Sequence, residues 1–267
     1  MILLIDAGNS RLKLGLLPAG AQHRRADTQA FEHTGLQALA DWLYALPEAP
    51  VRAVGVNVAG ADRGDVIARI VEQACGCGIE WLRAEKQTLS LRNGYDHPEQ
   101  LGVDRWAAML GVLARQPAQH PPFMVASFGT ATTLDTVNSD NVFLGGLILP
   151  GPAMMRTALA HGTANLPLAQ GAASAYPTDT NQAISTGVAA AQAGAVVRQW
   201  LAARTRFGAT PDIYVTGGGW PEIRTEVETL LAQAGAARSV STRPIHVDSP
   251  VLDGLAAWVL QTAERPQ

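Results

Sequence analysis

The strongest constraint on the fold is a short pattern at the start of the chain that occurs again near its middle. Residues 1–17 contain an apolar run, a polar turn with glycine, and a second run in which apolar residues alternate. Residues 123–137 repeat this order, with Gly129 and Thr130 in the turn. Apolar runs on both sides of a glycine turn are typical of β-hairpins. The sequence therefore predicts two similar hairpins, far apart in the chain.

The turn of the first hairpin carries residues suited to binding phosphate. Gly8 lets the backbone approach a bulky anion, Asn9 and Ser10 supply hydrogen-bond donors, and Lys13 supplies a positive charge. Asp6 would repel a phosphate, so its carboxylate favours a divalent cation between the two. An Asp-Ala-Gly-Asn turn is also an ordinary hairpin turn. This stretch alone leaves both interpretations open.

Further along the chain, strands and helices alternate. We expect helices over 35–46, 62–74, 102–114, 151–160, 186–205 and 251–260, and strands over 51–59, 142–150 and 212–219. This order indicates sheets with helices on their faces. A proline-rich break at 116–122 favours an extended connector. We therefore predict two domains, residues 1–115 and 122–267.

Composition excludes several classes of partner. The 267 residues have a formal net charge of -3, so no general positive field attracts nucleic acid or an anionic membrane. The one basic cluster, residues 23–25, is interpreted as a solvated hairpin end. No apolar run approaches the ~20 residues of a membrane span, and no signal peptide is recognised. Cys75 and Cys77 have neither zinc-ligand nor Cys-x-x-Cys spacing, so we expect idle thiols in a cytoplasmic protein.

Six motifs carry a resemblance to known families. DAGNS at Asp6, FGTATTLD at Phe128 and VTGGG at Val215 resemble the two phosphate motifs and the adenosine motif of the superfamily of actin-like ATPases, sugar kinases and heat-shock proteins. GVDRW at 102, GGLILPG at 145 and DGLAAWV at 253 are similar to the type III pantothenate kinase family. The resemblance implies an α/β fold of two ribonuclease-H-like (actin-like) domains, each with a mixed sheet flanked by helices. It also implies phosphorylation of pantothenate by ATP, the first step of coenzyme A synthesis.

The resemblance also implies roles for matching residues. The residues implied at the ATP phosphates are Asp6, Ala7, Gly8, Asn9, Ser10, Arg11, Leu12, Lys13 and Thr130. Asp6 would also hold Mg²⁺ through water, and Asp104 would be the general base. The residues implied at pantothenate are Tyr95, Gly102, Val103, Asp104, Arg105 and Thr180, the last reaching in from the other subunit of a homodimer.

Some alternatives remain open at this point. The family's ligand for potassium or ammonium is acidic, whereas this chain has Ser127 there, which puts the monovalent cation in doubt; Asp135 could compensate in part. Thr180 could instead cap a helix. The same two-domain fold could serve a nucleotide-sensing regulatory protein that acts through a partner, or another kinase of the superfamily that acts on a sugar.

Overall fold

The computed structural model describes residues 1–236 and 243–263, which form two compact units. The first unit contains residues 1–117 together with 249–267, and the second contains residues 118–248. The expected second domain, 122–267, reached to the end of the chain. The final helix, α7 (Pro250–Ala263), instead packs on α3 (Val103–Leu113) and belongs to the first unit.

The first unit is built on a mixed sheet with the strand order β3-β2-β1-β4-β5. Its strands are β1 (Ile2–Ala7), β2 (Arg11–Leu17), β3 (Gln29–Glu32), β4 (Arg52–Asn57) and β5 (Ile79–Trp81). Strands β1 and β2 form the predicted antiparallel hairpin, whereas β4 pairs parallel with β1. A second antiparallel hairpin follows along the chain, formed by β6 (Gln87–Thr88) and β7 (Leu91–Asn93), and then the short 3-10 helix η1 (Pro98–Gln100).

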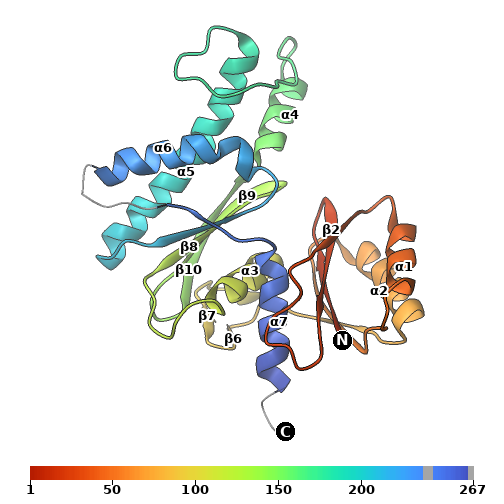
Figure 1. The fold of residues 1–267 in the computed structure, drawn as a ribbon. Coiled ribbons are helices and arrows are strands. Elements are labelled where there is room, and N and C mark those ends of the chain that lie inside the picture. The colour runs from red at the N-terminus through yellow and green to blue at the C-terminus, as the bar shows by residue number, and fades with distance from the viewer. Residues whose placement is uncertain (237–242, 264–267) are drawn as a thin grey trace. The chain divides into compact units, whose positions relative to one another are not determined.

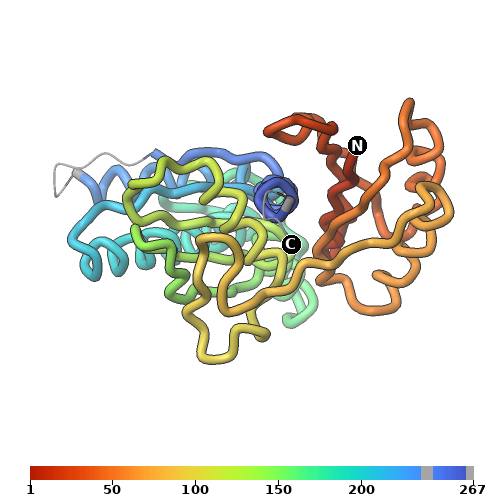
Figure 2. The backbone as a smooth tube through the Cα atoms, turned by 90° about the horizontal axis from the view of Figure 1, so that it is seen from below, coloured from red at the N-terminus to blue at the C-terminus, as the bar shows by residue number. Residues whose placement is uncertain are grey.

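Alternation along β1 separates its two faces. Leu3, Ile5 and Ala7 are fully buried in a core that includes residues of α1 (Leu36–Tyr44) and α2 (Ala61–Cys75). Because successive side chains point to opposite faces, Asp6 projects to the other face. That face is covered by α3 and α7, which contact β4 and β1 (Figures 1 and 2). The pleat of one strand therefore directs Asp6 toward the helix that carries Asp104.

The second unit repeats this plan. Its strands β10-β9-β8-β11-β12 follow the order and directions of β3-β2-β1-β4-β5. They are β8 (Phe123–Phe128), β9 (Ala131–Val137), β10 (Val142–Pro150), β11 (Asp212–Thr216) and β12 (Ile245–His246). Its helices are α4 (Pro152–Gly162), α5 (Thr180–Phe207) and α6 (Trp220–Ala236), of which α5 and α6 bury their apolar sides on the sheet. The predicted doubling of a sheet-plus-helices plan is confirmed.

Helix α6 was not among the predicted helices, although its apolar residues have helical spacing. Trp220, Ile223, Val227 and Leu231 recur at helical spacing and are all buried in the core of the second unit. Helix α5 also begins six residues before the predicted start at 186. Among residues 1–236 and 243–263, no helix combines the length and the apolar character that a membrane span needs.

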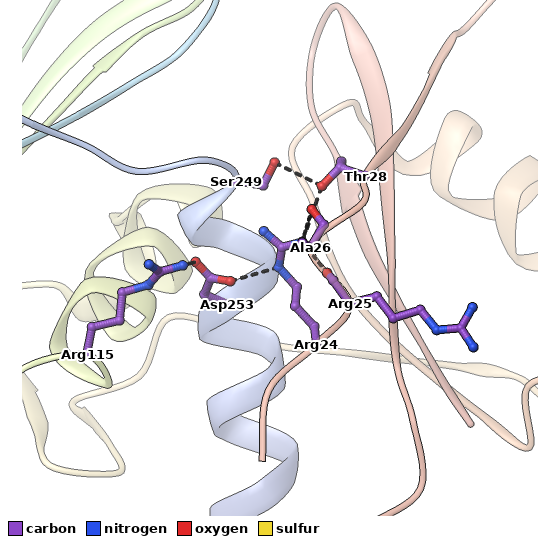
Figure 3. Close-up of polar contacts among 7 residues, drawn as sticks. All are labelled: Arg24, Arg25, Ala26, Thr28, Arg115, Ser249 and Asp253. Carbon is purple, nitrogen blue, oxygen red and sulfur yellow. Dashed lines mark hydrogen bonds and ion pairs between the residues drawn. The ribbon is translucent and has the colours of Figure 1, made fainter. Parts of the chain in front are cut away.

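The basic cluster at residues 23–25 is not wholly solvated, as Figure 3 shows. The Arg24 side chain is only 6% exposed and donates through Nε to Asp253 Oδ1 at 2.7 Å. Arg115 donates to the second oxygen, Oδ2, at 2.5 Å. Asp253 thus joins the segment after β2 and the end of α3 to helix α7. A partner 229 residues away explains why a local reading of the basic cluster was wrong for Arg24.

Helices α3 and α7 cross at two glycines, which gives a test of the first unit's packing. A Cβ atom at Gly254 would overlap the Ala107 carbonyl, and one at Gly111 would overlap the Pro250 carbonyl. We expect Gly254→Ala to lower the free energy of unfolding by about 2 kcal/mol, because overpacking forces the helices apart. Gly194→Ala is the control, since a Cβ there on α5 meets nothing within 4 Å.

The two substitutions should therefore change stability in opposite directions. Alanine at position 194 should raise it by up to about 1 kcal/mol, because glycine weakens a helix interior. Urea denaturation of both variants measures the difference. Equal effects at 254 and 194 would show that the close crossing of α3 and α7 does not limit stability.

Candidate active site

One group of candidate site residues lies at the end of the β1–β2 hairpin. Asp6 and Lys13 stand opposite each other in the antiparallel register, so their side chains share the face covered by α3 and α7. The turn between the strands is closed by the Gly8 N–H, which donates to the Arg11 carbonyl at 3.1 Å. Asn9 and Ser10 are exposed at the tip. This arrangement leaves a carboxylate, an amine and an open turn side by side.

Two carboxylates face the same region of this unit. Burial raises the pKa of Asp6 from its ordinary value of 3.8 to about 6; Lys13 lowers this pKa and the neighbouring Asp104 raises it. Asp104 lies in the first turn of α3, where its Oδ1 accepts the Arg105 backbone N–H at 2.8 Å. A Cβ at Gly102 would come within 2.8 Å of that oxygen, so glycine makes room for the carboxylate.

The carboxylate of Asp6 suits a hard divalent cation. In the described ranges no three His, Cys, Asp or Glu side chains converge to hold a metal by themselves. Mg²⁺ commonly binds through one or two carboxylates and completes its shell with water and substrate phosphates. The residues present therefore fit Mg²⁺ that arrives with a phosphate-bearing ligand, and such an ion would relieve the repulsion between the two carboxylates.

A tyrosine and an arginine meet beside Asp104. The Arg105 side chain is buried, and its Nη1 donates to the Tyr95 hydroxyl at 3.3 Å. Tyr95 itself is set by a turn in which its N–H donates to Asn93 Oδ1 at 3.1 Å. The structure thus places Tyr95 beside the segment 102–105, and the family resemblance implied all of these residues at pantothenate.

The second unit has its own hairpin tip, at Gly129 and Thr130, surrounded by backbone. The Gly151 N–H donates to the Thr130 carbonyl at 2.9 Å, and the Gly219 N–H donates to the Phe128 carbonyl at 2.9 Å. Gly217 has φ of 98°, and a Cβ there would overlap the Phe128 backbone. Helices α4 and α6 begin next to Gly151 and Gly219, and helix N-termini favour anions. This tip also suits a phosphate.

Thr180 does not cap helix α5, which was the alternative to its role at the substrate. The cap of α5 is Asp179, whose Oδ1 accepts the Gln182 N–H at 2.9 Å, so Thr180 is the first helical residue and not the cap. The Thr180 side chain is exposed and lines a cavity of about 870 Å³ between α4 and α5. Most of the residues that line this cavity are apolar, among them Met155, Leu159, Ile184 and Val188.

The two cysteines lie away from these groups and are free. Burial raises the pKa of Cys75 to about 11 and also raises that of Cys77, so neither thiol ionises readily. This agrees with the expectation of idle thiols.

The raised pKa of Asp6 predicts how stability depends on pH in the metal-free protein. The folded state holds its proton up to about pH 6, whereas an unfolded chain releases it near 3.8. The folded state therefore binds more protons between these values, and Asp6 costs stability increasingly as pH rises through them. Asp6→Asn removes this cost.

We expect the gain in stability from Asp6→Asn to be small at pH 4 and largest above pH 7. Urea denaturation in EDTA at several pH values between 4 and 8 measures it for wild type and variant. A gain that stays constant, or that shrinks as pH rises, would contradict burial of an ionisable Asp6.

Comparison with known proteins identifies a family. A model of the type III pantothenate kinase family matches residues 2–202. The type III pantothenate kinase of Bordetella bronchiseptica RB50 is 63% identical over 259 residues, which cover 96% of this chain and 97% of that protein. That of Bordetella pertussis Tohama I is 62% identical over 265 residues, covering 98% and 99%.

A solved structure extends the likeness at the level of fold. The putative 2-dehydro-3-deoxygalactonokinase of Sinorhizobium meliloti superimposes with a TM-score of 0.61 at 16% identity, covering 99% of this chain and 100% of that one. At this identity the likeness concerns the fold alone, and it confirms the predicted two-unit α/β architecture.

Proposed function

The chain belongs to the type III pantothenate kinase family, and on this premise we propose that it transfers the γ-phosphoryl group of ATP to the terminal hydroxyl of pantothenate. It is a kinase, and the reaction is the first step of coenzyme A biosynthesis. The observation that carries the proposal for its site is the meeting of Asp6, Lys13 and Asp104 on one face of the first sheet.

We assign Asp104 the role of general base. A primary alcohol is a weak nucleophile, and a carboxylate that accepts its proton contributes typically 10²- to 10⁴-fold. Asp104 has one oxygen fixed by the Arg105 N–H, which leaves the other for a substrate hydroxyl. Tyr95 and Arg105 would enclose pantothenate beside it, since their hydrogen bond holds both next to the start of α3.

Each hairpin tip, taken by itself, offers groups suited to the phosphates of ATP. In the first, residues Asp6 to Lys13 supply backbone donors, a positive charge and a carboxylate for Mg²⁺. In the second, Thr130 stands beside the starts of α4 and α6. Phosphoryl transfer depends on positioning and on stabilising charge spread over the phosphate oxygens, and Mg²⁺ supplies much of that charge when bound. Lys13 adds to it.

We expect the reaction to respond weakly to potassium or ammonium. Ser127 is paired in register with Thr133 and Thr216, so uncharged hydroxyls replace a carboxylate at this position. Asp135, two residues along β9 from Thr133, projects to the same face of the sheet and is 1% exposed. It is the carboxylate best placed to compensate.

The experiment that tests the function is ADP release from Mg-ATP with pantothenate, compared with sugars and with potassium present or absent. For Asp104→Asn we expect kcat to fall at least ~100-fold while the Kd of ATP changes less than ~2-fold, as loss of a general base predicts. Asp65→Asn, an exposed carboxylate on α2, is the control and should keep wild-type turnover.

The possible results separate the assignments. Release that depends on pantothenate and is lost in Asp104→Asn supports both the reaction and the base. Unchanged turnover in Asp104→Asn would remove Asp104 from that role, and release that depends only on a sugar would overturn the substrate.

A homodimer is the assembly that we propose, with the cavity beside Thr180 at its interface. Leu159 lines the cavity at 37% exposure, while Leu168 and Tyr176 in the adjoining segment are 59% and 90% exposed. Exposed apolar surface of this kind typically marks a site of association. Thr180 on its rim would then be able to reach the partner's substrate. Cytoplasmic location and the absence of nucleic-acid or membrane partners stay predictions.

Light scattering tests the dimer. We expect wild type at twice the monomer mass and Leu159→Arg at the monomer mass, because a buried unpaired charge at an apolar interface is costly. Val51→Arg is the control, since Val51 is an apolar residue of the other unit with 74% exposure. A monomeric wild type, or a dimeric Leu159→Arg with full activity, would contradict this interface.

A further inference from the structure

A histidine without an assigned role lies against the first hairpin tip. His33 follows directly after β3, whose Glu32 stands opposite Arg11 at the start of β2. Its Nε2 is 2.7 Å from the carbonyl oxygen of Gly8. Because a carbonyl can only accept, the ring nitrogen must donate, which fixes the proton on Nε2.

The other nitrogen of this ring has no comparable contact. His33 Nδ1 is buried and has no hydrogen-bond partner in the described part of the chain. Leaving a buried polar atom without a hydrogen bond costs free energy. A histidine with a purely structural role could be replaced by an apolar residue that avoids this cost. The hydrogen bond to Gly8 is therefore the one directional polar contact that the ring makes with the described residues.

An arginine contacts the next carbonyl of the same turn. Arg63, in the first turn of α2, is exposed, and its Nη1 donates to the Asn9 carbonyl oxygen at 3.4 Å. Two consecutive carbonyls of the tip are thus held by side chains from different elements, one after β3 and one on α2. We call these two residues the carbonyl clamp.

The clamp matters because of what a phosphate would meet at the tip. Carbonyl oxygens carry partial negative charge and repel phosphate, whereas consecutive N–H groups form an anion-binding concavity. The Asn9 N–H donates to no acceptor in the described chain, and the clamp draws the Gly8 and Asn9 carbonyls toward donors. Holding these carbonyls toward their donors keeps them from turning toward a phosphate that approaches the Asn9 amide hydrogen.

We propose that His33 and Arg63 are positioning residues that orient the backbone carbonyls of Gly8 and Asn9 for binding the phosphates of ATP. The proposal rests on the proposed function of the hairpin. It adds two residues, outside the motif, that act through the backbone of the motif. Arg63 also brings a guanidinium close to the tip, which adds positive charge where the phosphates would lie.

The test separates nucleotide binding from the rest of the reaction. We expect His33→Leu to raise the Kd of Mg-ATP, measured by calorimetry, by ~10-fold, since one hydrogen bond is worth about 1 kcal/mol and a free tip must also be ordered. The KM of pantothenate and kcat at saturating ATP should change less than ~2-fold. His33→Gln keeps a donor and should recover most of the affinity.

Matched controls exist for both members of the clamp. His23→Leu removes an exposed histidine of the same unit, and Arg69→Gln removes an exposed arginine of the same helix as Arg63. Both should bind Mg-ATP as wild type does, whereas Arg63→Gln should weaken binding several-fold. Because Arg63 is exposed, this variant also tests the clamp if His33→Leu does not fold.

The failures are distinguishable. Wild-type affinity in both His33→Leu and Arg63→Gln, with the kinase reaction intact, would overturn the clamp and leave the function standing. Equal loss of ATP and pantothenate affinity would show general damage to the fold and would also overturn it. A wild-type protein that does not bind Mg-ATP would overturn the clamp and the proposed function together.

Discussion

The first unit is organised around two carboxylates that its own fold forces together. The pleat of β1 turns Asp6 toward the face that α3 covers, and α3 begins with Asp104. Burial already disfavours the charge of Asp6, and Asp104 disfavours it further, with Lys13 the one neighbour that offsets them. A bound cation and a substrate hydroxyl would offset the burial of these carboxylates and the repulsion between them. The features that lower the stability of this unit on its own are therefore those that make it receptive to Mg-ATP and to an alcohol.

At the hairpin tips where we expect phosphates, glycines allow backbone segments to pack closer than side chains would permit. At the tip in the second unit, Gly151 and Gly217 admit two other segments against the hairpin, and the starts of α4 and α6 come with them. In the first unit the turn is held by His33 and Arg63 from outside. In both turns a glycine N–H donates to a backbone carbonyl of the same hairpin, Gly8 to Arg11 and Gly129 to Ala131. In both units, therefore, the same strand arrangement carries a glycine turn that is positioned by contacts from neighbouring elements.

Patterns in the sequence predicted the local elements, but they did not predict the contacts between segments far apart in the chain. Both hairpins, their flanking helices and the turn residues follow from apolar periodicity and glycine placement. His33 left no signal, because its partner is a backbone carbonyl 25 residues away that any sequence would supply. Arg24 belonged to a run that looked solvated, since Asp253 lies 229 residues from it. At α5, Asp179 and Thr180 are both good caps, and only the geometry shows that the aspartate takes the role. Helix α6 is different, because its pattern was present and was overlooked.

The position of α7 has a consequence for how the chain is made. This helix completes the first unit, through Asp253 and through its close crossing with α3, yet it is separated from the rest of that unit by all of residues 118–248. During synthesis the sheet of β1–β5 and helix α3 emerge early. The surface of α3 that α7 later covers must stay exposed while residues 118–248 are translated. The second unit, whose residues are continuous, has its whole sequence available first. The order of folding on the ribosome should therefore be the reverse of the order in the sequence.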